Sequence, residues 1–355
     1  MKSDSRKSGP VMRLWRMLML SFFAPCFSHA DGLQWVWEGQ SSGVNTSIRA
    51  LCAVDEKVCW FGTGKGMIGR TVNGGKSWSL IRVEGAEEVE FRDVEAFDAK
   101  RCIAMSVGEG TSSRIYRTVD GGENWDLVFQ NNAPRGFFDG VAFWDEENGI
   151  LAGDPVDGQL VILRTSDGGA SWTRVDSAPE MEEGEHAFAA SGTHLDVAKG
   201  GHVWVGSGGR VARVFYSRDF GKSWTTLDTP MIAGEDSTGV FSLAFKDSQN
   251  GFAVGGDHTK EAEGVRNALR TSDGGKSWKV LKDGESSVFS FRSCIRYVNG
   301  GKWIMTVGPD GCDISRDGGL TWKSFDEKGF HTFSIGGSMK AIWAAGSDGR
   351  VARLK

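Results

Sequence analysis

An eight-residue turn motif recurs six times along the chain and limits the possible folds more than any other feature of the sequence. Its form is Thr/Ser-x-Asp/Asn-x-Gly-x-x-Trp, and the copies lie at Thr71–Trp78, Thr118–Trp125, Thr165–Trp172, Ser217–Trp224, Thr271–Trp278 and Ser315–Trp322. Successive tryptophans are 47, 47, 52, 54 and 44 residues apart. This period is typical of one four-stranded β-propeller blade and not of leucine-rich or helical repeats.

The residue types of the motif indicate a tight turn. An Asp or Asn side chain is expected to accept a hydrogen bond from the backbone N–H two residues on. The second glycine, present in all six copies, supplies a left-handed backbone conformation without steric cost. Phe220 replaces the first glycine once, which indicates a less demanding position. The tryptophan starts the next strand and buries its ring between blades.

Each repeat is expected to contain four strands, with the motif before the outermost one. In the third repeat these are 138–143, 149–153, 160–165 and 171–175, chosen from alternation and from Val, Ile and Phe content.

The two ends of the chain predict how the ring closes. Three strands without a fourth are expected at 332–335, 341–346 and 350–354, and an orphan strand at 33–39. Pairing the orphan with the last three makes a seventh blade and removes open sheet edges. The sequence therefore predicts an all-β, seven-bladed propeller as one domain over residues 31–355.

Residues 1–30 have the features of a signal peptide. A basic stretch precedes the apolar run 17–24, and Ser28-His29-Ala30 offers small residues where signal peptidase cleaves. We expect cleavage near Ala30 and export to the periplasm or the outside of the cell. A membrane anchor is the alternative, disfavoured because the apolar run is short. Met12 is an alternative start.

Five cysteines follow the predicted cleavage site: Cys52, Cys59, Cys102, Cys294 and Cys312. Export permits disulfides, but an odd number leaves at least one thiol unpaired within a chain. Cys52 and Cys59 flank a short turn and are candidates to face each other across a hairpin. Small buried thiols are the favoured interpretation.

The composition of the chain argues against several classes of ligand. The net charge of −5 and the absence of a Lys/Arg run after the signal argue against nucleic acid, which needs a basic surface. Neither a Cys/His metal spacing nor a nucleotide-, flavin-, haem- or iron–sulfur-binding pattern occurs, so no metal and no cofactor is predicted. We expect a monomer.

Propeller topology places the remaining polar residues. Loops that enter the inner strands and loops between second and third strands share one face, opposite the turn motifs. Ligand sites usually lie in such variable loops. The predicted binding face comprises Arg49, Arg92, Asp93, Asp139, Asp154, Asp157, Glu183, Glu185, His186, Asp257, His258, Arg292 and His331.

This face suits recognition of an anion by arginine or acid–base chemistry by carboxylates. Asp139, Asp154 and Glu185 are the catalytic candidates. The alternative is that these charged residues pair with one another and only satisfy strand ends.

The form RT-x-DGG-x-SW, at Arg164–Trp172 and Arg270–Trp278, resembles the photosystem II stability/assembly factor family of BNR/Asp-box propellers, within the sialidase-like superfamily. The resemblance extends over the whole chain after the signal. Segments such as 153–158 and 329–334 are similar to a bacterial branch often labelled oxidoreductase or glycosyl hydrolase. The resemblance implies an exported scaffold that binds a protein partner in the cell envelope.

A glycoside hydrolase is the alternative function, with carbohydrate as the ligand. Sialidases share these turns but also have an Arg-Ile-Pro segment and a tyrosine nucleophile. The chain has no Arg-Ile-Pro, and Tyr116, Tyr216 and Tyr297 fall within predicted strands. A carboxylate pair drawn from Asp139, Asp154 and Glu185 would still serve glycoside hydrolysis.

Overall fold

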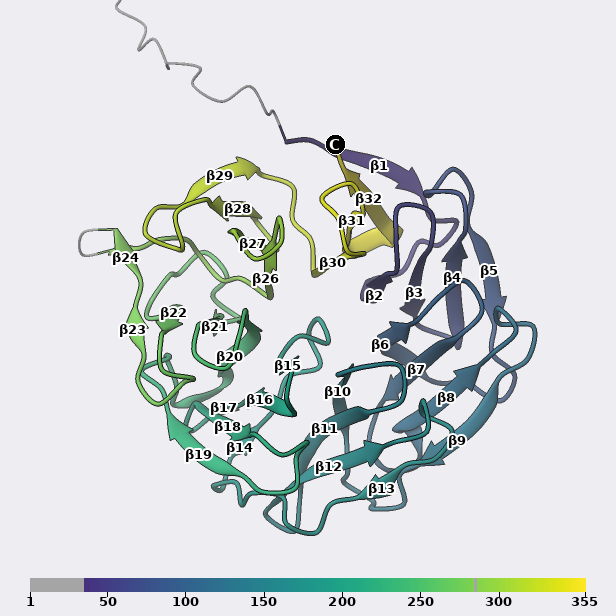
Figure 1. Ribbon diagram of the computed structural model, residues 1–355, viewed down its shortest axis with the longest axis horizontal. Coiled ribbons are helices and arrows are strands. Elements are labelled where there is room, and N and C mark those ends of the chain that lie inside the picture. Colours follow the sequence, from purple (N-terminus) through teal and green to yellow (C-terminus); the bar gives the residue numbers. More distant parts are fainter. Residues whose placement is uncertain (1–34, 284–285) are drawn as a thin grey trace, which may run out of the picture. The chain divides into compact units, whose positions relative to one another are not determined.

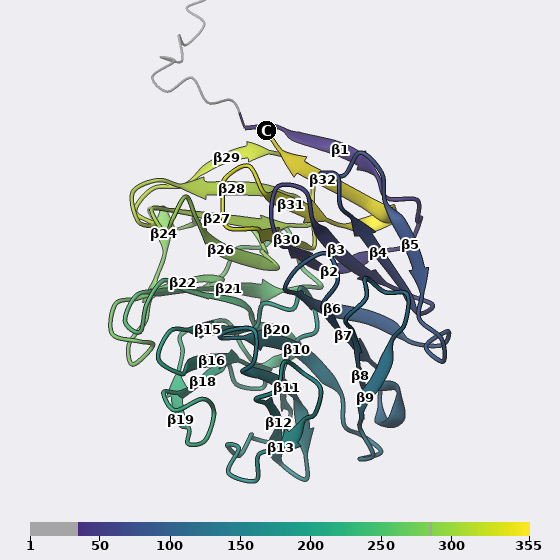
Figure 2. The ribbon, with the colours of Figure 1, turned by 45° about the vertical axis from the view of Figure 1, so that its right-hand side comes forward.

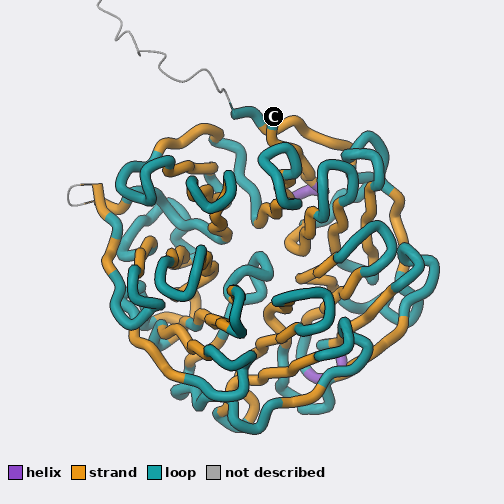
Figure 3. Tube along the Cα trace, in the orientation of Figure 1, coloured by secondary structure: helices purple, strands orange, loops and turns teal. Residues whose placement is uncertain are grey.

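The computed structural model describes residues 35–283 and 286–355, and these form a β-propeller of seven blades (Figure 1). Strands and loops make up nearly all of it, and the two helices found there are single 3₁₀ turns, Gly110–Ser112 and Ser347–Gly349 (Figure 3). None of the helices in this part of the chain is long and apolar enough to cross a membrane. The predicted signal peptide lies outside the described residues and stays a prediction.

Blades 1 to 3 follow the chain in order, each with its strands running from the centre outwards. Their strands are β2 (Ile48–Ala53), β3 (Cys59–Thr63), β4 (Met67–Thr71) and β5 (Ser79–Arg82); β6 (Glu90–Ala96), β7 (Cys102–Val107), β8 (Arg114–Thr118) and β9 (Asp126–Gln130); and β10 (Phe138–Phe143), β11 (Gly149–Val156), β12 (Gln159–Thr165) and β13 (Thr173–Arg174).

Blades 4 to 6 continue the ring, with a few additional short strands. Blade 4 contains β15 (Leu195–Ala198), β16 (His202–Gly206), β18 (Arg213–Ser217) and β19 (Thr225–Asp228); blade 5 contains β20 (Glu235–Phe245), β21 (Gly251–Asp257), β22 (Ala268–Thr271) and β23 (Lys279–Val280), extended by β14 (Glu185–His186) and β17 (Gly208–Gly209); and blade 6 contains β26 (Cys294–Val298), β27 (Trp303–Gly308), β28 (Gly311–Ser315) and β29 (Lys323–Asp326). A small hairpin, β24 (Lys282–Asp283) and β25 (Ser286–Ser287), stands between blades 5 and 6.

Blade 7 joins the two ends of the chain, as predicted. Its strands are β30 (Thr332–Ile335), β31 (Ile342–Ala345) and β32 (Arg350–Leu354), and its outer strand is β1 (Trp37–Ser41). Trp37 lies opposite Leu354 in the antiparallel register, and β1 follows β32 along its length in both ribbon views (Figures 1 and 2). This pairing confirms the predicted closure of the ring.

The hydrophobic core is divided into clusters between adjacent blades. One cluster packs Trp60 of blade 1 against Phe91 and Tyr116 of blade 2, all 2% exposed or less. Blade 7 contributes to two clusters, because Phe333 packs towards blade 6 and Trp343 packs towards blade 1. Because each fully buried large side chain stabilises by roughly 1.5–3 kcal/mol, every blade depends on both its neighbours.

The turn motif, here called the Asp box, caps itself over a longer distance than predicted. In the third copy Asp167 accepts a bond from the N–H of Ser171 at 3.0 Å, four residues on and not two. The Thr165 hydroxyl accepts the N–H of Gly169 at 3.0 Å and donates to Asp167 at 2.7 Å. The bond between residues two apart is made instead by Thr165, whose hydroxyl accepts the N–H of Asp167 at 3.4 Å. The Asp167 carboxylate is therefore free to bond to Ser171 near the end of the box.

Both central positions of the Asp box need a left-handed backbone. The second glycine has a positive φ in all six copies, for example 78° at Gly169, as predicted. Phe220, at the first position, also has a φ of 62°. The expectation that this position is undemanding is therefore wrong. The Phe220 ring packs edge-on against Trp144 at 5.0 Å, a contact that offsets its backbone strain.

The Asp boxes lie on the face opposite the predicted binding loops. In five blades a backbone N–H of the box donates to a carbonyl of the turn between the first and second strands, at 2.8–3.0 Å. In blade 3, for example, the Gly168 N–H donates to the Glu147 carbonyl. These turns occupy the other end of the inner strands from Arg49 and Arg92. The two faces of the propeller are therefore sorted as the topology predicted.

Candidate functional site

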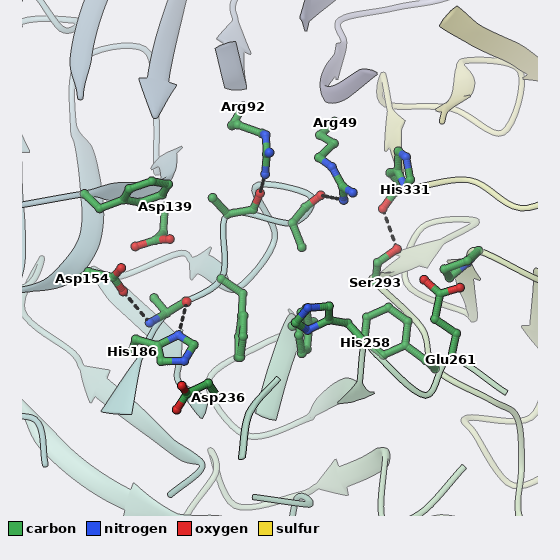
Figure 4. Close-up of a pocket in the computed structure, with 18 residues that line it drawn as sticks. Arg49, Arg92, Asp139, Asp154, His186, Asp236, His258, Glu261, Ser293 and His331 are labelled. Atoms are coloured by element: carbon green, nitrogen blue, oxygen red, sulfur yellow. Dashed lines mark hydrogen bonds between the residues drawn. The ribbon is translucent and has the colours of Figure 1, made fainter. Parts of the chain in front are cut away.

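A cavity of about 390 Å³ lies at the centre of the binding face, and we call it the funnel. Seven of the predicted residues line it: Arg49, Arg92, Asp139, Asp154, His186, His258 and His331 (Figure 4). They come from blades 1, 2, 3, 5 and 7 or the loops beside them, although they are as many as 282 residues apart in the chain. Ring closure is what brings them together.

The connection from the end of β13 at Arg174 to the start of β15 at Leu195 is longer than the other connections between blades, and we call it the long insertion. Its residues 187–190 cross the funnel and form part of its wall; we call them the central segment. Arg92 donates to the Ala189 carbonyl at 2.8 Å, and Arg49 donates to the Ala190 carbonyl at 3.2 Å. On the other side, the Ala187 N–H donates to Asp154 at 2.9 Å (Figure 4). The charged residues therefore hold the backbone of the insertion in place.

One side of the funnel consists of the basic residues Arg49, Arg92 and His331. Arg92 is paired with Glu90 at 2.6 Å. Arg49 is half-buried and, within the described residues, makes its one hydrogen bond to the central segment and no ion pair. Burial, followed by Arg49 and Arg92, lowers the pKa of His331 to about 4, so this imidazole is neutral at neutral pH.

The acidic side contains Asp139 and Asp154 on adjacent strands of blade 3. Asp139 is 1% exposed, and its Oδ2 atom has no hydrogen-bond partner among the described residues. Burial and then Asp154 raise the pKa of Asp139 well above its usual range, and burial raises the pKa of Asp154. The two carboxyls therefore hold a proton more strongly than exposed aspartates do.

The sequence reasoning missed several lining residues. Asp236 and Glu261 stand at the rim, on β20 and after β21. Phe188, Phe241 and Phe291 form an apolar wall, in which Phe188 stacks on Phe241 at 3.8 Å and Phe241 meets Phe291 edge-on at 4.8 Å. Phenylalanines in strand-like runs are usually core residues, so the sequence held no signal for an aromatic wall.

Six predicted residues lie outside the funnel lining: Asp93, Asp157, Glu183, Glu185, Asp257 and Arg292. Asp93 accepts the N–H groups of Val94 and Val141 and so links blades 2 and 3. Asp257 accepts bonds from Thr259. Asp157 and Glu183 are exposed in loops.

The expectation that Glu185 and Arg292 face the funnel needs correction. Glu185 is 2% exposed and paired with Arg213, and its Oε1 atom accepts a bond from Ser207 at 2.5 Å. Arg292 is 5% exposed and paired with Asp310 at 2.5 Å and Asp313 at 2.8 Å. Each of the two side chains is therefore neutralised by a partner of opposite charge within the fold. Because Glu185 is buried and ion-paired away from the funnel, it is no longer a catalytic candidate.

The described chain contains neither the hairpin disulfide considered above nor a cluster of metal-binding side chains. Cys52 lies opposite Trp60, and Cys59 lies opposite Ala53, so their side chains are on opposite faces of the sheet and cannot form the hairpin disulfide considered above. All five described cysteines are free thiols. Among the described residues there is no cluster of three or more His, Cys, Asp or Glu that would hold a metal ion.

Comparison with known proteins begins with the repeat. The family model described as BNR/Asp-box repeat matches residues 215–226. This chain carries a BNR/Asp-box repeat. The match covers the fourth of the six copies, from the end of β18 to the start of β19. A comparison with curated protein sequences found no significant match.

Solved structures with the same fold fall into two groups. A structure of YCF48 bound to D1 peptide is 14% identical with a TM-score of 0.65, covering 89% of this chain and 94% of its own. YCF48 from Cyanidioschyzon merolae is 14% identical with a TM-score of 0.66, covering 90% and 98%. The GH74 enzyme of Niastella koreensis is 12% identical with a TM-score of 0.55, covering 86% of this chain but only 51% of its own. These likenesses establish the seven-bladed BNR/Asp-box fold.

Proposed function

We propose that this chain is an exported binding protein of the cell envelope that receives a peptide segment of a partner protein in the funnel. The observation that carries the proposal is Arg49, a half-buried guanidinium on the funnel wall without an ion pair in the described part of the chain. Burial and then Arg92 lower its pKa while Glu90 and Glu261 oppose the shift, so its charge is only partly compensated. An anionic group of a ligand would supply that compensation.

The remaining walls fit a peptide. The three phenylalanines offer an apolar surface for a side chain, and the carbonyls and N–H groups of the central segment lie beside it. The solved YCF48 structure contains a bound D1 peptide, and the fold is shared over almost the whole of both chains. The resemblance of the repeats to photosystem II assembly factors also favours a protein that binds a partner during its assembly.

A pair of peptide libraries tests this function. Random pentapeptides with a free C-terminal carboxylate are compared with the same peptides amidated at the C-terminus, by fluorescence polarisation. We expect binding to the free-carboxylate library, weakened at least about tenfold in Arg49→Ala and by amidation. Arg82→Ala, at an exposed site on outer strand β5, is the matched control. Equal binding by the Arg49→Ala variant, or no binding of either library, would contradict the proposal.

Export and a monomeric state are parts of the same proposal. Supporting export are the basic and apolar segments of residues 1–30 and the small residues that end at Ala30. N-terminal sequencing of the protein recovered from the expressing cell should begin near Asp31. Recovery of the intact N-terminus from a cytoplasmic fraction would reject export. Light scattering should give the mass of one chain.

Glycoside hydrolysis is the second candidate, and one observation favours it. Asp139 and Asp154 share the funnel and take part in no ion pair among the described residues, so both remain available for acid–base chemistry. A GH74 xyloglucanase of Xanthomonas campestris has the same fold, with a TM-score of 0.54 and 14% identity. Release of reducing sugar from xyloglucan by this chain, abolished in Asp139→Asn, would support hydrolysis, and no release would reject it.

A further inference from the structure

The charged residues of the funnel are segregated around the ring. The cations Arg49 and Arg92 and the neutral His331 belong to blades 1, 2 and 7, which are neighbours. The carboxyls belong to blades 3 and 5: Asp139 on β10, Asp154 on β11 and Asp236 on β20, with Glu261, after β21, apart from these three beside His258. Figure 4 shows the first group along one side of the cavity and Asp139, Asp154 and Asp236 along another. We call this second group the acidic wall.

The carboxyls of the acidic wall are not neutralised by ion pairs in the described chain. None of its three carboxyls takes part in an ion pair there, in contrast to Asp310 and Asp313, which are paired with Arg292. Asp154 uses one oxygen to accept the Ala187 N–H. Asp139, 1% exposed, also lines the funnel, and its Oδ2 has no hydrogen-bond partner among the described residues. A buried polar atom without a partner is uncommon in a folded protein and indicates a missing group.

We propose that the acidic wall binds the guanidinium or ammonium group of an arginine or lysine side chain in the peptide that occupies the funnel. The inference rests on the proposed peptide-binding function and specifies its ligand: a segment with a basic side chain on one side and a carboxylate on the other. Asp154 and Asp236 contact the cation. Asp139 adds its charge to the attraction, and its unpartnered Oδ2 is available to accept from the cation.

The acidic wall gives the binding a characteristic pH dependence. Burial and then Asp154 raise the pKa of Asp139 well above its usual range, and burial raises the pKa of Asp154, while Arg92 on β6 opposes the rise at Asp139; His186 on β14 also faces the pair. A cation favours the ionised form of both carboxyls, so binding releases a proton. The affinity for a cation therefore rises with pH until the pair is fully ionised.

The test uses n-butylguanidinium as the probe, with n-butanol as its uncharged match, and the purified chain. Isothermal calorimetry and saturation-transfer NMR at pH 5 and pH 8 measure binding. We expect saturable binding of n-butylguanidinium that strengthens about tenfold or more from pH 5 to pH 8, and none of n-butanol. Asp154→Asn should weaken binding at pH 8 at least about tenfold, and Asp139→Asn should remove most of the pH dependence.

Control variants separate recognition from folding. Asp126→Asn, at an exposed site on β9 outside the funnel, should bind like the wild type. Thermal melting confirms that each variant is folded. Equal affinity of Asp154→Asn and wild type, an affinity that falls with rising pH, or no binding at pH 8 would overturn the proposal. Because this probe carries no carboxylate, its binding is independent of Arg49, so failure of the peptide libraries and failure of the acidic wall are distinguishable.

Discussion

Glu185 and Arg213 form a buried ion pair that joins the long insertion to blade 4. The Glu185 side chain is fully buried and that of Arg213 is 14% exposed. The same carboxylate accepts the Ser207 hydroxyl and the Glu182 N–H at 2.9 Å. Through these bonds one residue fixes the start of the segment that crosses the funnel.

Loss of Arg213 should therefore destabilise the protein strongly. Arg213→Met leaves the Glu185 carboxylate buried without its cation, and we expect the free energy of unfolding to fall by about 3–5 kcal/mol. Glu185→Gln, which keeps the hydrogen-bonding shape, should cost less. Urea denaturation measures both. Arg174→Met, on the exposed strand β13, is the control. An Arg213→Met variant as stable as the control would show that the pair is unimportant.

The closure of the ring predicts a large effect at Trp37. This side chain is 2% exposed and packs against Phe330 at 5.2 Å between ring centroids. Trp37→Ala leaves a cavity in the cluster between blades 6 and 7, so unfolding should become easier by about 3–5 kcal/mol. Val36→Ala, at an exposed neighbouring site, should change stability by less than about 0.5 kcal/mol. Similar melting of the two variants would count against ring closure by β1.

Glu95, on the inner strand β6, should make stability depend on pH. Burial raises its pKa from 4.5 to about 7, while Arg296 opposes the rise and Asp196 adds to it. Glu95 ionises near pH 4.5 in the unfolded chain but only near pH 7 in the folded one, so stability falls as the pH rises between these values. Glu95 is half-buried, and we expect the loss to be about 1–2 kcal/mol.

Glu95→Gln removes this ionisation. Denaturation curves at pH 4.5 and pH 8 should therefore show a smaller loss of stability in the variant than in the wild type. Glu84→Gln, at an exposed site, should behave like the wild type. If the wild type and Glu95→Gln lose the same stability over this range, the raised pKa of Glu95 is refuted.

The thiols of the folded protein should react slowly. Burial raises the pKa of Cys312 to about 12 and the pKa values of Cys59 and Cys102 well above the usual range. Because the thiolate is the reactive form, Ellman's reagent should modify Cys59, Cys102 and Cys312 only after denaturation. Non-reducing mass spectrometry should find no disulfide between Cys52 and Cys59. Rapid reaction of these thiols in native protein would contradict their burial.

Much of the fold was predictable because it depends on local chemistry. The hydrogen bonds that cap the Asp box lie within its own eight residues, so its copies and spacing predicted the order of six blades, and the unmatched strands at the two ends of the chain predicted the seventh. Strand limits such as 138–143 and 332–335 matched because alternation of apolar residues is a local property. Phe220 was misjudged because its strain is offset by Trp144, which lies 76 residues earlier in the chain.

The sequence by itself determined the blades, the face on which each loop lies and which end strands pair, because these follow from turns and from strand periodicity. Only the tertiary structure decided which charges remain available. Arg49 and Arg292 occupy similar positions in the sequence repeats. In the structure, however, Arg292 forms ion pairs with Asp310 and Asp313, while Arg49 lines the cavity. The physical reason is that an ion pair or an aromatic wall depends on side chains brought together from separate blades, and these distances exist only once the ring has closed.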